Sequence, residues 1–108
     1  MLFTKSMNEL SGMLERGETT AVSIAEEIIQ RIESKNGSLN AFIAFDAAAL
    51  RAQAAESDAR RAAGRTLSRF DGIPLGIKDN IAVKGVQLSC ASRILEGFAA
   101  PYDATVTE

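Results

Sequence analysis

Hydrophobic residues in the first part of the chain recur with the spacing of α-helices. Over residues 6–16, Leu10 and Leu14 fall on one helical face, and the Ser6 side chain is suited to cap the first turn. Gly17 follows directly and suits the left-handed position that commonly ends a helix. The pattern therefore predicts a short, capped helix over these residues.

The second predicted helix has the clearest pattern in the chain. Its apolar residues recur at i, i+3, i+4, i+7 and i+11, and they are Ala21, Ile24, Ala25, Ile28 and Ile32. Thr20 is a suitable N-cap, and Asn36 followed by Gly37 is typical of a helix end. We expect the apolar face to pack in the core of the domain, since amphipathic helices usually bury that face.

A short β-strand and a third helix are expected next. The aromatic and branched residues between Ala41 and Phe45 favour a strand. Asp46 then caps a helix that runs to about Ala63 and ends at Gly64. Because the apolar face of this helix is mostly alanine, it buries little area, and we expect it at the periphery.

After the third helix, helical periodicity disappears, and glycine, proline and β-branched residues become frequent. Residues 73–77 alternate with period two, which favours a strand, and residues 86–88 favour a further extended stretch. Residues 93–97 are suited to one helical turn. The chain is therefore expected to be one α/β domain, with residues 1–67 mainly helical and residues 68–108 forming a strand and loop segment.

The last residues have the pattern of the start of another helix. Asp103 is suited to cap a first turn at residues 104–108, where the sequence stops without apolar periodicity or a C-cap. A helix this short is not stable alone. We therefore expect the domain to be incomplete, with the sequence ending inside an element.

Composition narrows the possible functions. The net charge of -2 gives no strong attraction to nucleic acid or membranes, and no stretch is apolar enough to span a bilayer or to form a signal peptide. The single cysteine, Cys90, fits a reducing cytoplasm, and we expect it to be buried and inert. The absence of histidine excludes Ser-His-Asp and Cys-His catalysis within these residues. A catalytic base would have to be a lysine, a carboxylate or the cysteine.

Lys78 is the candidate for such a base. Gly72 and Gly76 precede it and permit close approach of the backbone. A lysine held among apolar side chains loses the hydration that favours its charged form, and a neutral lysine can take a proton from a serine hydroxyl. On spacing alone, the favoured interpretation is an ordinary solvated lysine, with Asp79 helping to solvate the strand end.

Four arginines near the end of the third helix form the other charged cluster: Arg60, Arg61, Arg65 and Arg69. They could contact phosphates of a nucleic acid. Arginines at a helix C-terminus are also favourable when simply solvated, and no aromatic residues alternate with these. With a net charge of -2, the solvated interpretation is favoured.

The residues around Lys78 resemble a known motif. Residues 72–81, Gly-Ile-Pro-Leu-Gly-Ile-Lys-Asp-Asn-Ile, are similar to the lysine-bearing motif of the amidase signature family, and the likeness covers nearly the whole chain. Within the family, the Pro-Tyr-Asp-Ala-Thr-Val stretch at residues 101–106 and the surroundings of Cys90 most resemble the glutamine-hydrolysing subunits of glutamyl/aspartyl-tRNA amidotransferases.

The resemblance implies a fold, a mechanism and partners. Family members carry helices packed on a central mixed sheet and hydrolyse amides with a Ser–Ser–Lys triad, in which Lys78 would deprotonate a bridging serine. In the amidotransferases, glutamine would acylate the nucleophilic serine and release ammonia for conversion of Glu-tRNA(Gln) or Asp-tRNA(Asn). The implied assembly is a cytoplasmic heterotrimer whose partner subunits bind ATP and Mg and most of the tRNA. No cofactor or metal is expected in this chain.

One part of the family pattern is missing. The glycine-flanked serine pair that follows the family's lysine motif has no counterpart in the 108 residues, and neither Ser89 nor Ser92 lies in a glycine-rich setting. We therefore assign no serine role and expect the chain alone to have no amidase activity. Two alternatives stay open: a part of another amidase-signature hydrolase that acts on small amides, and a non-catalytic truncated product that acts only by binding a partner.

Overall fold

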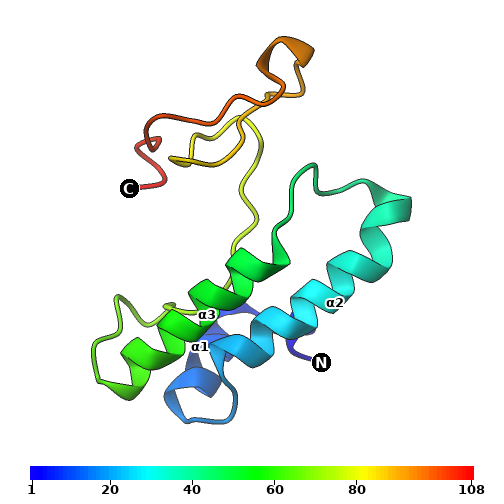
Figure 1. Cartoon of the computed structure of the whole chain (residues 1–108). Coiled ribbons are helices and arrows are strands. Elements are labelled where there is room, and N and C mark those ends of the chain that lie inside the picture. Colours follow the sequence, from blue (N-terminus) through cyan, green and yellow to red (C-terminus); the bar gives the residue numbers. More distant parts are fainter. The chain divides into compact units, whose positions relative to one another are not determined.

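A computed structural model describes all 108 residues. The elements follow in the order η1 (Leu2–Thr4), α1 (Met7–Glu15), α2 (Ala21–Leu39), α3 (Ala47–Ala62) and η2 (Arg93–Leu95), where η is a short 3-10 helix (Figure 1). The chain divides into two compact units, which we call the helical unit (Met1–Pro74) and the lysine-bearing unit (Leu75–Glu108). No helix is both long enough and apolar enough to cross a membrane.

All three α-helices begin at the side-chain caps expected from the sequence. The Ser6 hydroxyl accepts a hydrogen bond from the Glu9 amide, and the Glu9 carboxylate accepts one from the Ser6 amide, at 3.3 and 2.8 Å. This reciprocal pair is a capping box. The hydroxyl of Thr20 and the carboxylate of Asp46 cap α2 and α3 in the same way. The predicted starts of the helices are confirmed.

The predicted ends are correct for α1 and α3 and wrong for α2. Gly17 and Gly64 follow α1 and α3 in the left-handed conformation, each with φ of 69°. Helix α2 continues past Gly37 to Leu39, and Asn40 takes the left-handed position instead, with φ of 51°. Asn36 does not end the helix, because its side-chain amide binds both backbone polar groups of Phe42, at 2.8 and 3.0 Å.

The core of the helical unit lies on two sides of α2. One cluster joins α1 to α2 and contains Leu10, Leu14 and Ile24. The other joins α2 to α3 and contains Ala21, Ala25 and Ala54. Small side chains let these two helices approach closely, and Figure 1 shows them side by side. The predicted apolar face of α2 is therefore the face that organises this unit.

The sheet expected from the sequence is not found in these residues. The segments 41–45 and 73–77 form no strand, and the sole strand pairing is an isolated antiparallel bridge between Gln87 and Ala99. A strand needs a partner, and the surrounding chain is helix and turn. In the first segment the Asn36 side chain satisfies the backbone of Phe42 in place of a partner strand. The expected mixed sheet is thus wrong for this stretch of sequence.

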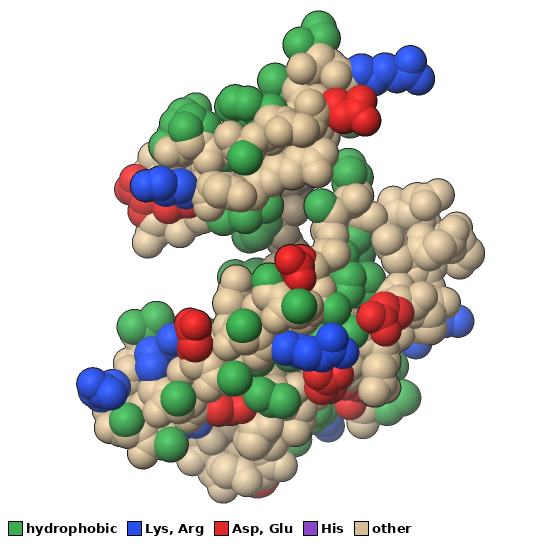
Figure 2. Space-filling view, in the orientation of Figure 1, with side chains coloured by type: hydrophobic (Ala, Val, Ile, Leu, Met, Phe, Trp, Pro, Cys, Tyr) green, Lys and Arg blue, Asp and Glu red, His purple; other side chains and the backbone are tan.

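Other parts of the lysine-bearing unit follow the sequence more closely. The helical turn expected at residues 93–97 is η2. The expected helix start at residues 104–108 is only a turn, and the Asp103 carboxylate accepts from the amide of Lys84, at 2.7 Å, instead of capping it. Large hydrophobic side chains remain exposed in both units, including Ile43, Leu75 and Ile94 (Figure 2). Exposed apolar surface of this kind is typical of contact faces.

Candidate functional site

Lys78 lies at the surface of the lysine-bearing unit, in the segment that follows the alternating residues. Its carbonyl oxygen accepts a hydrogen bond from the Ile81 amide at 3.0 Å, so residues 78–81 form a turn. The apolar neighbours Leu75 and Ile77 are themselves 69% and 50% exposed and do not enclose it. Its side chain makes no hydrogen bond or ion pair with the rest of the chain. The role of Lys78 as a base stays a prediction.

The adjacent residue, Asp79, is the most connected polar group of this unit. Its carboxylate accepts from the Ser89 amide at 2.9 Å, from the Ser89 hydroxyl, and from the Ala91 amide at 3.4 Å. Its carbonyl oxygen accepts from the Cys90 amide at 3.0 Å. These bonds, those from Ser89 first, favour the ionised form and lower the pKa of Asp79. The expectation that Asp79 only solvates a strand end missed this role, and no local pattern could have paired it with a segment ten residues away.

The three residues that Asp79 holds form a strained turn. Cys90 and Ala91 have φ of 50° and 58°, the left-handed region that costs a non-glycine residue about 1–2 kcal/mol. Ser89 is buried, and its hydroxyl donates to the Asp79 carboxylate. Cys90 is exposed, so the expectation of a buried cysteine is wrong. The strained backbone carries its side chain outward.

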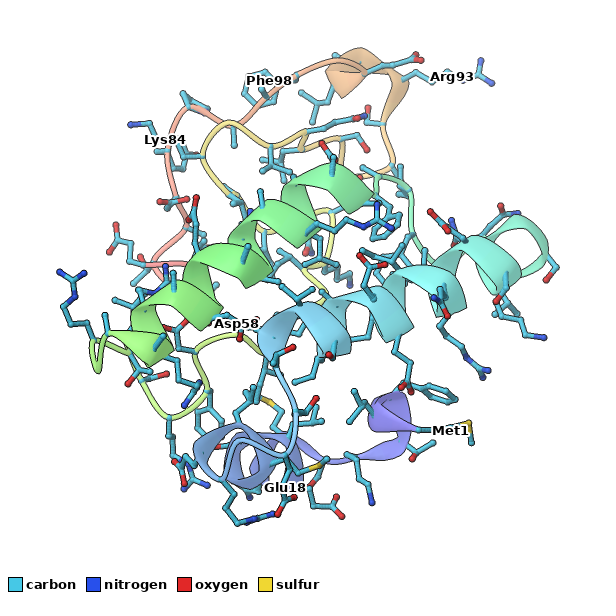
Figure 3. All side chains as sticks on the ribbon, turned by 60° about the horizontal axis from the view of Figure 1, so that its bottom comes forward. Met1, Glu18, Asp58, Lys84, Arg93 and Phe98 are labelled. Atoms are coloured by element: carbon cyan, nitrogen blue, oxygen red, sulfur yellow. The ribbon has the colours of Figure 1, made fainter.

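Backbone pairing supports this turn from both sides. The Gly85 amide donates to Ala100 and the Ala100 amide donates to Val86, at 2.8 and 3.0 Å, while the Leu88 amide donates to Phe98 at 2.9 Å. These bonds surround the isolated bridge and join two antiparallel segments. Figure 3 labels Lys84, just before the first segment, Phe98 in the second, and Arg93 in the η2 turn that lies between them in sequence. The turn at residues 89–91 is thus held by a small backbone ladder as well as by Asp79.

In the helical unit, Asp71 accepts hydrogen bonds from two of the clustered arginines. Its carboxylate binds Arg60 through two bonds of 2.7 and 2.9 Å, and it also accepts from the Ser57 hydroxyl and the Leu67 amide. Arg61 donates to its carbonyl oxygen at 2.9 Å. The Arg60 guanidinium, first among these, holds the pKa of Asp71 well below its ordinary range. The expectation that Arg60 and Arg61 are merely solvated is therefore wrong, because both anchor Asp71.

The segment around Asp71 is fixed to all three helices. Arg69 donates to Asn8 on α1, at 3.2 Å, and its carbonyl oxygen accepts from the Ser11 hydroxyl at 2.8 Å. Gly72 has φ of 97° and lies so close to α2 and α3 that an added Cβ would stand 2.7 Å from Ala21 and from Ser57. Three of the four arginines are thus engaged within the fold, which weakens the case for a phosphate-binding surface. No group of three metal-binding side chains is present in the chain.

Another carboxylate missed by sequence reasoning lies at the start of α2. Asp58, on α3, accepts from the amides of Ala21 and Val22 at 2.8 and 3.0 Å (Figure 3). Free amides at a helix N-terminus favour a negative charge. Here the anion that they bind is a side chain of the same unit, so this helix end is structural.

Comparison with known proteins places these features in a family. The family model described as Amidase matches residues 23–108. The chain is 47% identical over 103 residues to the glutamyl-tRNA(Gln) amidotransferase A subunit of Synechococcus elongatus, covering 95% of this chain and 22% of the relative. The A subunits of the same name from Chlamydia felis and Roseiflexus sp. are 41% and 44% identical over 105 residues each, covering 97% of this chain and 21% of the relative.

A solved structure is also similar. It comes from work described as "An unexpected vestigial protein complex reveals the evolutionary origins of an s-triazine catabolic enzyme", and it has a TM-score of 0.83 and 30% identity, covering 93% of this chain and 22% of that one. The chain therefore spans about a fifth of the length of the proteins that it matches. Because the family match includes the Lys78 motif and four-fifths of the sequence, the chain belongs to the amidase family.

Proposed function

We propose that this chain is the N-terminal, lysine-bearing part of a glutamine-hydrolysing amidase subunit. The subunit would supply ammonia for the conversion of Glu-tRNA(Gln) to Gln-tRNA(Gln) or of Asp-tRNA(Asn) to Asn-tRNA(Asn). The observation that carries the proposal is the identity of 41–47% with amidotransferase A subunits over nearly all of the chain.

Lys78 would be the base of a Ser–Ser–Lys triad. Its neutral amine would take a proton from a bridging serine, which would take one from the nucleophilic serine as that oxygen attacks the side-chain amide carbon of glutamine. The C–N bond would then break, ammonia would leave with the proton, and water would release glutamate from the acyl-serine. Both serines lie outside the 108 residues, so the chain alone would be inactive.

The exposure of Lys78 fits a site in which the base belongs to this chain and both serines lie outside it. A lysine acts as a base only through its neutral amine, which removal of water by neighbouring groups favours. In this chain the side chain is open to solvent. The groups that would remove water from the Lys78 amine would therefore lie outside these 108 residues.

The rest of the proposal concerns the assembly. The subunit would work in the cytoplasm with the other subunits of a heterotrimer, one of which would hold ATP and Mg and activate the acyl group on tRNA. Most contacts to tRNA would be made by that partner. The engagement of Arg60, Arg61 and Arg69 within the helical unit agrees with a minor part for this chain in tRNA binding.

A second candidate is a part of an amidase that acts on small amides. It is favoured by the structural match, at 30% identity, to a complex connected with s-triazine catabolism. The two candidates share Lys78 and differ in the substrate pocket.

A chimera tests the proposal. This chain replaces the matched region of the Synechococcus elongatus relative. Ammonia release by the chimera is then measured with glutamine, asparagine and small amides such as propionamide. The proposal expects glutamine hydrolysis comparable with that of the unmodified relative. The same relative without its first residues is the control and should be inactive. A folded chimera that hydrolyses only small amides would favour the second candidate, and one that hydrolyses none would contradict both.

A further inference from the structure

The Lys78–Asp79 segment is held from one side by the turn at residues 89–91. Asp79 contributes two different groups to this contact, a carboxylate that binds Ser89 and Ala91 and a carbonyl oxygen that binds the Cys90 amide. All three backbone amides of the turn therefore point at one residue. The Ser89 and Ala91 amides bind the carboxylate and the Cys90 amide binds the carbonyl oxygen, so the turn holds both the side chain and the backbone of Asp79.

The same contacts restrict the backbone of Lys78. The peptide group after Lys78 is fixed by the bond from the Ile81 amide to the Lys78 carbonyl oxygen, 3.0 Å long. The next peptide group is fixed by the bond from the Cys90 amide to Asp79. These two peptide planes meet at the Cα of Asp79, and the first of them also contains the Cα of Lys78. The position of the Lys78 Cα is therefore tied to the turn through Asp79, although the Lys78 amine is free in solvent.

We propose that Asp79 is a positioning residue for Lys78, which fixes the backbone of the base by binding the turn at residues 89–91. The inference rests on the proposed function, because that function makes Lys78 the base. The contacts of Asp79 that carry the inference are independent of that function. A base must be held within a fraction of an ångström of its productive position, and it is best held by groups that are themselves fixed. The buried hydroxyl of Ser89 is the fixed partner that Asp79 uses here.

A competing explanation gives Asp79 a purely local role. Cys90 and Ala91 are strained, so Asp79 would be needed only to keep them in the left-handed conformation. The two explanations differ at Lys78. If Asp79 positions the base, its removal loosens the backbone at residue 78, and if it only supports the turn, the backbone at residue 78 stays ordered.

The experiment measures ¹³Cα relaxation, which gives an order parameter for the Cα–Hα bond of each residue, in the 108-residue chain and in Asp79→Asn. This variant replaces one acceptor oxygen by a donor that faces backbone amides. We expect the order parameter of Lys78 to fall from about 0.85, typical of rigid backbone, to below about 0.6. The matched control is Asp103→Asn, a carboxylate of the same unit that binds the single amide of Lys84. That control should leave the order parameter of Lys78 unchanged.

Ser89→Ala keeps the proposal testable if Asp79→Asn unfolds the unit, since it removes one donor and leaves the carboxylate. It should lower the order parameter of Lys78 in the same direction and by less. The proposal is overturned if the variants loosen residues 89–91 while Lys78 stays rigid, or if Asp103→Asn has the same effect as Asp79→Asn. No turnover is measured, so a failure of the glutamine assay and a failure of this inference are separate results.

Discussion

Gly72 is the position where the fold of the helical unit can be tested most sharply. In Gly72→Ala the new Cβ would stand 2.7 Å from the Cβ of Ala21 and 2.7 Å from the hydroxyl oxygen of Ser57. Both neighbours are fully buried, and the Ser57 hydroxyl is bound to Asp71. Serine could rotate away only by giving up that bond, and Ala21 could yield only by a shift of α2.

The expected loss of stability has two parts. A non-glycine residue in the left-handed region costs about 1–2 kcal/mol, and Gly72, with φ of 97°, lies beyond the centre of that region. Overpacking a tight contact costs about 1–3 kcal/mol more. We therefore expect Gly72→Ala to lower the free energy of unfolding by about 2–5 kcal/mol, a large share of the 5–15 kcal/mol typical of a small domain.

Gly64→Ala is the matched control. Gly64 also has positive φ, 69°, but an added Cβ would meet nothing within 4 Å. This variant should lose only the backbone part, about 1–2 kcal/mol. The entropy that alanine removes from the unfolded chain is common to both variants and cancels in the comparison. Urea unfolding followed by far-UV circular dichroism gives both values. Equal losses in the two variants would refute the close approach of Gly72 to α2 and α3.

Three further predictions concern charged residues. Asp71→Asn should destabilise the helical unit by about 2–3 kcal/mol at neutral pH, because it disturbs bonds to a guanidinium, a hydroxyl and an amide. The native pKa of Asp71 is depressed below the ordinary value of about 3.9, so its contribution to stability is complete above about pH 5 and is lost as the pH falls further. Urea midpoints between pH 7 and 2.5 should therefore fall less steeply in the variant than in the parent. Asp58→Ala should lower the stability by about 1–2 kcal/mol in the same urea assay, since it exposes two amides at the start of α2, and an unchanged midpoint would refute this cap. Lys78→Met should change the free energy of unfolding by less than about 0.5 kcal/mol, and a larger loss would mean that the lysine has a structural partner.

Local chemistry made the helices predictable. Ser6, Thr20 and Asp46 each cap the helix that follows. The amide of the third residue on donates to the hydroxyl or carboxylate, and this local contact is set by the sequence itself. Gly37 was misleading, since glycine in a helix interior costs only about 1 kcal/mol and the left-handed position that ends α2 is taken by Asn40. The capping role of Asp58 was out of reach because it crosses 36–37 positions of sequence.

The strands and the site were less predictable because they depend on distant partners. The alternation at residues 73–77 favours a β-strand with one face buried. These 108 residues provide no strand to pair with it. Lys78 could be singled out from its motif, whereas the contact between Asp79 and Ser89 could not, since nothing in either local sequence specifies the other. The exposure of Cys90 likewise follows from a left-handed turn that no propensity would assign to Cys-Ala.

The measurement that tests the account most directly is the turnover of glutamine by the chimera with Lys78→Met, compared with Lys84→Met. Both are exposed lysines of the same unit, and only Lys78 is proposed as the base. The account predicts that Lys78→Met lowers kcat by about 100-fold or more while Lys84→Met leaves it unchanged. Equal activity of the two variants would contradict the assignment of Lys78 as the base.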